Sequence, residues 1–224
     1  MEKDRTEQDQ ANKASLLPRK LTPVKTLPQS FRPRGTFDIS QGSNRTLIAL
    51  NVVGAIMFFV FGWLFLKIAI PLRPELADEI LLIPRNMLRF TVLCVVATVV
   101  LITLHELTHG LFFWLFTREQ PRLGFRLFYA YAAAPDWYIP RRQYFVVALS
   151  PLVLLTLVGF LLLWQLPIWI VPPLLFGMLM NAGGSVGDIA VILWLIAKPS
   201  GVLIRDIGDS ISIYGLPPTE KPGS

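Results

Sequence analysis

Cysteine, histidine and charged residues are all scarce in this sequence, and the scarcity of cysteine and of charge excludes particular kinds of protein. Cys94 is the only cysteine among 224 residues, which excludes an intramolecular disulfide framework and a cysteine-based metal cage. Charged residues make up 16% of the chain and hydrophobic residues 53%, with a mean hydropathy of +0.53. This composition excludes an ordinary soluble domain. The two histidines both lie in one apolar segment, LITLHELTHGLFF.

Four long apolar runs predict a multi-pass membrane protein. A helix needs roughly 20 apolar residues to cross the hydrocarbon core of a bilayer. The runs cover residues 46–70, 87–117, 143–164 and 168–197, and the links between them are short and rich in proline or charge. We therefore predict an all-α integral membrane fold with about four transmembrane helices, in one domain over residues 46–214.

The first 45 residues differ in character from the rest of the chain. They are polar, contain nine Lys/Arg against five Asp/Glu, and have no apolar block that could serve as a signal peptide. We expect a disordered basic cytosolic tail that contacts anionic lipid and not nucleic acid, and a flexible C-terminal tail over residues 215–224. The positive-inside rule then places both termini in the cytosol, with the protein in the plasma membrane.

Deep inside the four runs, the only ionisable side chains are His105, Glu106, His109 and Asp188. A charged group at the bilayer centre costs at least ~2.5 to 3.5 kcal/mol on insertion scales. Such residues therefore mark a functional site, and they are expected to face one another or a water-filled cavity.

The spacing of HELTH is that of an H-E-x-x-H metal site. Residues four apart lie on one face of a helix, so His105 and His109 present two imidazole nitrogens together. Glu106 lies about 100° around the helix, where it can take a proton from a zinc-activated water. The pattern predicts a zinc hydrolase with Glu106 as general base.

A catalytic zinc site normally has three protein ligands, and we assign the third to Asp188. The extended zincin pattern would need glycine and histidine where this chain has Phe112 and Leu115. His109 lies nine residues before Arg118 and Asp188 ten before Lys198, which places both about 14 to 15 Å from the cytosolic ends of helices that run in the same direction. Two carboxylates, from Asp188 and Glu106, also balance the charge of zinc.

The segment NAGGSVGD before Asp188 predicts a close helix contact and a loosened helix. Gly183 and Gly187 form a small-xxx-small pair, and the paired glycines let the aspartate reorient. Asn181 is interpreted as binding the substrate backbone or orienting a ligand, and an interhelical hydrogen bond is the alternative.

Residues 124–133, GFRLFYAYAA, predict a short cytosolic strand or hairpin at the membrane interface between the second and third helices. The aromatic side chains alternate, with Tyr129 and Tyr131 on one side. A strand edge there would hold an unwound substrate by main-chain hydrogen bonds, with Tyr129 and Tyr131 as substrate-binding residues. The alternative is an aromatic belt at the level of the lipid headgroups.

The motifs HELTHG, ALSPL and NAGGSVGD together resemble the bacterial putative zincin peptidase family, a domain of unknown function, over about residues 90–214. More distantly they resemble the site-2 protease family of intramembrane metalloproteases. That resemblance implies zinc bound by His105, His109 and Asp188, with Glu106 as the catalytic base. Here Gly187 precedes Asp188 and Ile189 follows it, where site-2 proteases end their motif in Leu-Asp-Gly.

The prediction from these residues is a membrane-embedded zinc metalloprotease that cleaves a membrane protein or peptide within or next to the bilayer. Two alternatives remain open. One is a non-catalytic membrane protein in which zinc only joins two helices. The other is a metal transporter that uses the same four groups as a transit site, although the runs contain few further polar residues to line a path.

Overall fold

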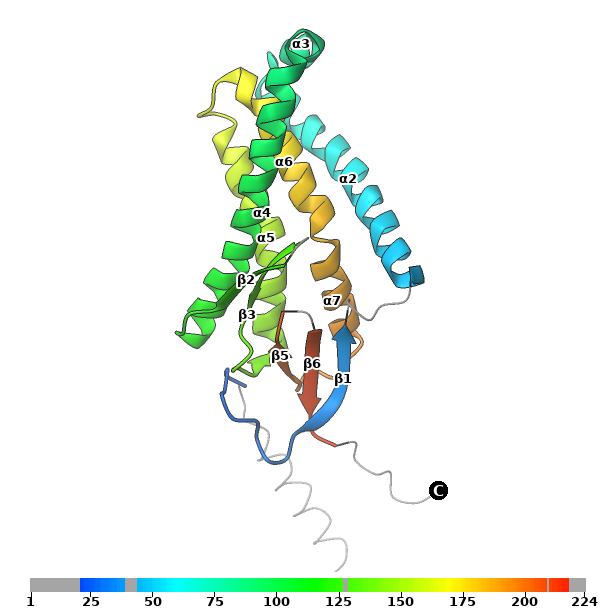
Figure 1. Cartoon of the computed structure of the whole chain (residues 1–224), viewed down its shortest axis with the longest axis vertical. Coiled ribbons are helices and arrows are strands. Elements are labelled where there is room, and N and C mark those ends of the chain that lie inside the picture. The colour runs from blue at the N-terminus through cyan, green and yellow to red at the C-terminus, as the bar shows by residue number, and fades with distance from the viewer. Residues whose placement is uncertain (1–20, 39–43, 127–128, 209, 218–224) are drawn as a thin grey trace, which may run out of the picture.

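The protein is elongated, with a bundle of long helices at one end and strands at the other (Figure 1). The computed structural model describes residues 21–38, 44–126, 129–208 and 210–217. The helices are α2 (Asn44–Leu72), α3 (Leu76–Leu82), α4 (Met87–Thr117), α5 (Arg141–Leu162), α6 (Val171–Gly184) and α7 (Val186–Ile196), with 3₁₀ turns η1 (Ile83–Asn86) and η2 (Ile168–Ile170).

Four helical segments are long and apolar enough to cross a membrane, as the sequence predicted. They cover Ile48–Leu72, Leu76–Thr117, Arg141–Leu162 and Ile168–Ile196. Their outer surfaces are strongly apolar, and on α2 the side chains of Phe59 and Trp63 are 73% and 64% exposed. Contiguous apolar surface of this kind is unstable against water and requires lipid or a partner to cover it.

Small residues set the close contacts between the helices. Helix α4 packs against α5 and α6, whereas α2 lies outside them on α6 and α7. A Cβ atom added to Gly177 of α6 would lie 3.2 Å from the Cβ of Ala97 on α4, and one added to Gly54 of α2 would lie 3.2 Å from the Gly183 carbonyl oxygen. These backbones approach because no side chain separates them, as predicted for Gly183.

The last apolar run is divided into two helices at Ser185, directly after the paired glycines. Helix α6 ends at Gly184, Ser185 has ψ of 4°, and α7 begins at Val186. The Ser185 hydroxyl donates to the Asn181 carbonyl at 2.9 Å. The predicted loosening therefore occurs, and it places Asp188 in the first turn of α7, where the positive end of the helix dipole stabilises a carboxylate.

The strands form two antiparallel sheets beside the ends of the helices. The hairpin of β2 (Arg122–Arg126) and β3 (Tyr129–Ala133) confirms that residues 124–133 belong to a hairpin between the second and third long helices. A second sheet has the order β1-β6-β5-β4. Its strands are β1 (Arg32–Asp38), β4 (Ile139–Pro140), β5 (Leu203–Asp206) and β6 (Ser210–Gly215).

The second sheet corrects two sequence predictions, the all-α fold and the tail disordered through residue 45. Strand β1 lies within that tail and pairs with β6, where Thr36 and Ser212 are hydrogen-bonded at 3.1 Å across 176 residues of chain. The side chains of β1 are mostly exposed, so the strand carries little apolar signal of its own. Residues 1–20 and 218–224, which the predictions assign to the tails, lie outside the described residues.

The sheet is anchored by an apolar core shared with the helix ends. Ile204 of β5 and Ile213 of β6 are fully buried and cluster with Val191 and Leu195 of α7. Alternate residues of β6 are buried, as expected for a sheet with one face on a core. This packing places Asp206 and Gly208, at the β5–β6 turn, around the same cavity as the histidines and Asp188.

Candidate metal centre

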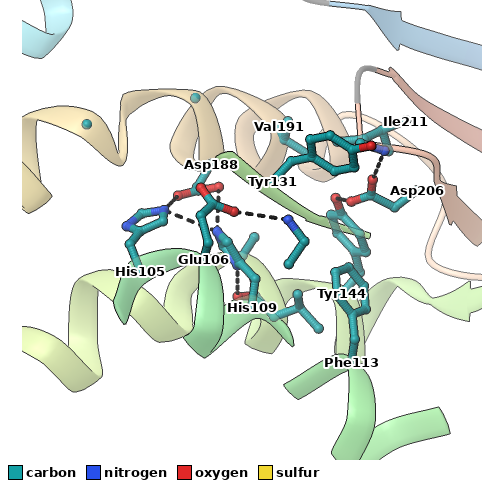
Figure 2. Close-up of a pocket in the computed structure, with 16 residues that line it drawn as sticks. His105, Glu106, His109, Phe113, Tyr131, Tyr144, Asp188, Val191, Asp206 and Ile211 are labelled. Carbon is teal, nitrogen blue, oxygen red and sulfur yellow. Dashed lines mark hydrogen bonds and ion pairs between the residues drawn. The ribbon is translucent and has the colours of Figure 1, made fainter. Parts of the chain in front are cut away.

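The three predicted ligands meet at one point between α4 and α7 (Figure 2). The Nε2 atoms of His105 and His109 are 3.2 Å apart. The Asp188 carboxylate lies 3.2 Å from the Nε2 of His105 and 3.4 Å from the Nε2 of His109. The prediction that His109 and Asp188 share one level is therefore confirmed, across 79 residues of sequence.

The donor atoms lie close enough together to surround one zinc ion. Zinc binds imidazole nitrogen at about 2.0 to 2.1 Å and carboxylate oxygen at about 2.0 to 2.2 Å, so neighbouring ligand atoms of a tetrahedron are about 3.3 to 3.5 Å apart. The two Nε2 atoms are 3.2 Å apart, and the Asp188 carboxylate approaches each of them through a different oxygen, Oδ2 at 3.2 Å from His105 and Oδ1 at 3.4 Å from His109. One donor atom from each residue lies within 4.8 Å of the other two, so a small shift of the side chains would enclose a zinc ion. Two imidazoles and one carboxylate are also a donor set that zinc favours.

Hydrogen bonds at the opposite ring nitrogens leave both Nε2 atoms available as ligands. The Nδ1–H of His109 donates to the Val147 carbonyl oxygen at 2.9 Å, and the Nδ1–H of His105 donates to Oδ1 of Asn181 at 2.9 Å. With the Nδ1 atoms engaged, both Nε2 atoms face the Asp188 carboxylate, as the nitrogens of metal-bound histidines do when their other ring nitrogen is hydrogen-bonded. The residues present therefore fit a divalent metal.

Pro151 explains why the Val147 carbonyl is available to His109. In a regular helix this carbonyl would accept the N–H of residue 151, but proline has none. The carbonyl instead accepts from His109 and from the Ser150 hydroxyl, at 2.9 and 2.7 Å. Sequence reasoning missed the roles of Val147 and Pro151, although the proline of ALSPL inside an apolar run was a visible signal.

Asn181 is hydrogen-bonded to one of the candidate ligands, His105. Its amide accepts from His105 and donates to the Pro151 carbonyl at 3.4 Å, and the residue is only 3% exposed. Both ends of the side chain are thus engaged within the protein, so the structure favours the ligand-orienting interpretation of Asn181 over the substrate-binding one.

Replacing Asn181 with alanine is expected to weaken zinc binding by about 10- to 100-fold, because loss of the partner of a metal-bound histidine frees the ring to rotate. Competition with a chelator of known affinity measures this change. Asn51→Ala, at an exposed position on α2, is the matched control and should leave the affinity unchanged. Equal affinity in both variants would contradict the role given to Asn181.

Glu106 lies beside the three ligands and is held by the hairpin. The Ala132 N–H of β3 donates to Oε2 of Glu106 at 3.1 Å. Among the residues that the structure describes, no hydrogen-bond partner is found for the other carboxylate oxygen. One oxygen thus fixes the orientation of the group, while the second is available for proton transfer.

A cavity of about 400 Å³ opens beside the ligands and Glu106. It is of the size that binds small molecules or peptide side chains. Helices α4, α5, α6 and α7 and strands β3, β5 and β6 all contribute to its lining, which comprises His105, Glu106, His109, Phe113, Tyr131, Ala132, Tyr144, Val147, Ala148, Gly184, Gly187, Asp188, Val191, Asp206, Gly208 and Ile211.

Tyr131, a predicted substrate-binding residue, lines this cavity. Its ring lies against two glycines, since an added Cβ would come within 2.4 Å of the ring at Gly124 and within 2.6 Å at Gly208. The ring therefore joins the hairpin to the β5–β6 turn at the wall of the cavity. Tyr129 lies in the same strand, but its side chain is outside the described residues.

Sequence reasoning missed a second polar pair in the cavity, Tyr144 and Asp206. The Tyr144 hydroxyl donates to Oδ2 of Asp206 at 2.6 Å, and the Gly208 N–H donates to Oδ1 at 2.8 Å. Asp206 is 8% exposed, and burial raises the pKa of its carboxyl although both hydrogen bonds act to lower it. Asp206 follows the last apolar run, so the search for charges inside the runs could not find it.

Comparison with known proteins bears out the family resemblance. A family model described as "Putative zincin peptidase" matches residues 98–203. No curated protein and no solved structure matches the chain. The matched segment contains His105, Glu106, His109 and Asp188, and it ends before Asp206. Zinc, the metal that this family description implies, is also the metal that the site at His105, His109 and Asp188 fits.

Proposed function

From the match to zinc peptidases, we propose that this chain is a membrane-embedded zinc metallopeptidase that hydrolyses peptide bonds within or next to the bilayer. The observation that carries the proposal is the convergence of His105, His109 and Asp188, with donor atoms within 4.8 Å of one another, on a cavity that Glu106 also lines. A site that only joined helices through a metal would have no need of the cavity or of an oriented carboxylate.

Glu106 is placed to move the proton that peptide hydrolysis requires. Bound zinc would supply positive charge that polarises the scissile carbonyl and makes an attacking water more acidic. Glu106 takes the proton of that water and delivers it to the leaving amine. The N–H of Ala132 keeps the carboxylate in position through both transfers, so the hairpin takes part in aligning the base.

The outer edge of β3 is suited to hold an extended substrate. Residues of an antiparallel strand point their backbone groups alternately toward and away from the partner strand. The Ala132 N–H bonds Glu106 and not β2, so this side of β3 faces away from β2. The carbonyl of Ala132 and the backbone groups of Ala130 point to the same outer edge. Within the described part of the chain, β3 pairs only with β2. A peptide added at this edge would lie along the cavity wall.

The apolar surface and the distribution of lysine and arginine support this placement in the membrane. The exposed faces of α2 and α4 are covered by lipid in this proposal, and the strand end of the molecule lies at the cytosolic surface, because lysine and arginine are most abundant in the adjoining segments. Strand β1 and strand β6 lie side by side at this end (Figure 1), in agreement with two cytosolic termini. The substrate is then a membrane protein or peptide whose scissile bond lies near that surface.

Removal and return of the metal tests the proposal. Purified protein in detergent micelles should cleave members of a quenched-fluorescent peptide library, lose at least about 99% of that activity after dialysis against 1,10-phenanthroline, and regain it on addition of zinc. The His105→Ala, His109→Ala double variant, purified in parallel, is the control for contaminating proteases. Equal cleavage by wild type and double variant would refute the proposal.

A further inference from the structure

The cavity contains a second charged group that the hydrolytic chemistry does not use. Asp206, on β5, lines the same cavity as the metal ligands and is 8% exposed. In the described part of the chain it forms no ion pair with any lysine, arginine or histidine. Its two hydrogen bonds come from neutral donors, Tyr144 and Gly208. A buried carboxylate without a cation is costly to maintain.

Asp206 and Tyr144 offer acceptors to a ligand that enters the cavity. A carboxylate has about four acceptor sites, and Asp206 uses two of them. The Tyr144 hydroxyl donates its only proton to Asp206, but its oxygen still has lone pairs that can accept a hydrogen bond. A donor-rich cationic group such as an ammonium or guanidinium matches this arrangement. Figure 2 shows the pair on the opposite side of the cavity from His105, with Ile211 and Val191 nearby.

The charges of the zinc-bound site also favour a cationic ligand beside Asp206. A zinc ion brings two positive charges, and Asp188 and Glu106 balance them. Asp206 is not needed for that balance, and its own hydrogen-bond donors are neutral. Apolar lining from Phe113 and Val191 would accommodate the methylene groups of a long cationic side chain.

We propose that Asp206 and Tyr144 form a specificity subsite that binds a cationic group of the peptide substrate, either the side chain of a lysine or arginine or the α-ammonium of a free N-terminus. The subsite deepens the peptidase function proposed above and rests on it. The cation satisfies the buried carboxylate, and the distance between subsite and metal centre selects which peptide bond lies at the catalytic group.

Peptide binding to an inactive protein tests the subsite separately from catalysis. The probes are peptides Ala-Ala-Ala-Xaa-Ala-Ala-Ala with a C-terminal fluorophore, in which Xaa is lysine or its uncharged isostere norleucine, each with an acetylated or a free N-terminus. Fluorescence anisotropy measures their dissociation constants for zinc-loaded Glu106→Gln protein. We expect a cationic group to tighten binding at least about tenfold, the usual effect of a hydrogen bond to a charged partner.

Asp206→Asn in the same background is the decisive variant, because asparagine keeps the shape and can still accept from Gly208. It should reduce the preference for the cation to about twofold or less. Asp136→Asn, at an exposed carboxylate paired with Arg122, should leave the preference intact. If Asp206→Asn does not fold, Tyr144→Phe should lower the preference severalfold.

The arms identify the source of the cation. If acetylated lysine peptides bind more tightly than acetylated norleucine peptides, the subsite binds a side chain. If tighter binding appears only when the N-terminus is free, the subsite binds the α-ammonium. Equal binding of charged and neutral peptides, no measurable binding of any of them at millimolar concentration, or a preference that survives Asp206→Asn would overturn the subsite. Failure of cleavage by wild-type protein, with the binding preference present, would count against the peptidase function alone.

Discussion

Replacing Glu106 with glutamine is expected to lower peptide cleavage by about 10²- to 10⁴-fold, the usual contribution of a general base, while zinc remains bound. Glutamine has nearly the same shape, and its amide oxygen can still accept the N–H of Ala132 that holds Glu106. It cannot, however, accept a proton from water. Initial rates on a cleaved peptide and the zinc content of the same preparation together measure the two halves of this prediction.

The matched control is Glu75→Gln, at an exposed carboxylate paired with Arg73 in the link before α3. It removes the same charge from a position far from the cavity in the sequence and the fold, and the cleavage rate should remain within about twofold of wild type. Normal turnover by Glu106→Gln would refute the proposed mechanism. Loss of zinc from that variant would instead indicate that Glu106 acts through the stability of the site.

The candidate metal ligands could be located in the sequence because ionisable residues are rare inside long apolar runs. In a soluble protein His105, Glu106 and Asp188 would be three among many ionisable residues, but inside apolar runs each has a high transfer cost and requires a reason. Helical periodicity predicted that His105 and His109 lie on one face. Asp188 was chosen because it lies about as far from the end of its helix as His109 does from the end of its own. These arguments need only the rise per residue and the direction of each helix.

The remaining parts of the site depend on contacts that no local pattern encodes. Strand β1 is polar and exposed, and it is a strand only because β6 pairs with it from the other end of the chain. Asp206 enters the cavity because the β5–β6 turn packs against the helices, and nothing in its own segment marks it as buried. Tyr144 resembles an interfacial tyrosine in sequence, whereas its hydroxyl binds Asp206 inside the protein.

Replacing Asp188 with alanine is expected to weaken zinc binding by more than about 100-fold, since the loss of a direct ligand exceeds the 10- to 100-fold effect of an outer partner. The variant loses one of three donors and also the negative charge that lies 3.2 and 3.4 Å from the two Nε2 atoms. Zinc content after equilibration with a competing chelator measures the affinity. His105→Ala should show a loss of the same order.

Thermal unfolding provides a second measurement of the Asp188 prediction. Zinc that binds only the folded protein stabilises it by about 2.7 kcal/mol at a free concentration one hundred times the dissociation constant. Wild-type protein should therefore melt at a higher temperature with zinc than with chelator, and Asp188→Ala should show almost no difference at that same concentration. Asp136→Ala, which removes an exposed carboxylate, should keep the wild-type response. Full zinc content in both Asp188→Ala and His105→Ala would remove the basis for the metal centre, and with it the hydrolytic role of Glu106.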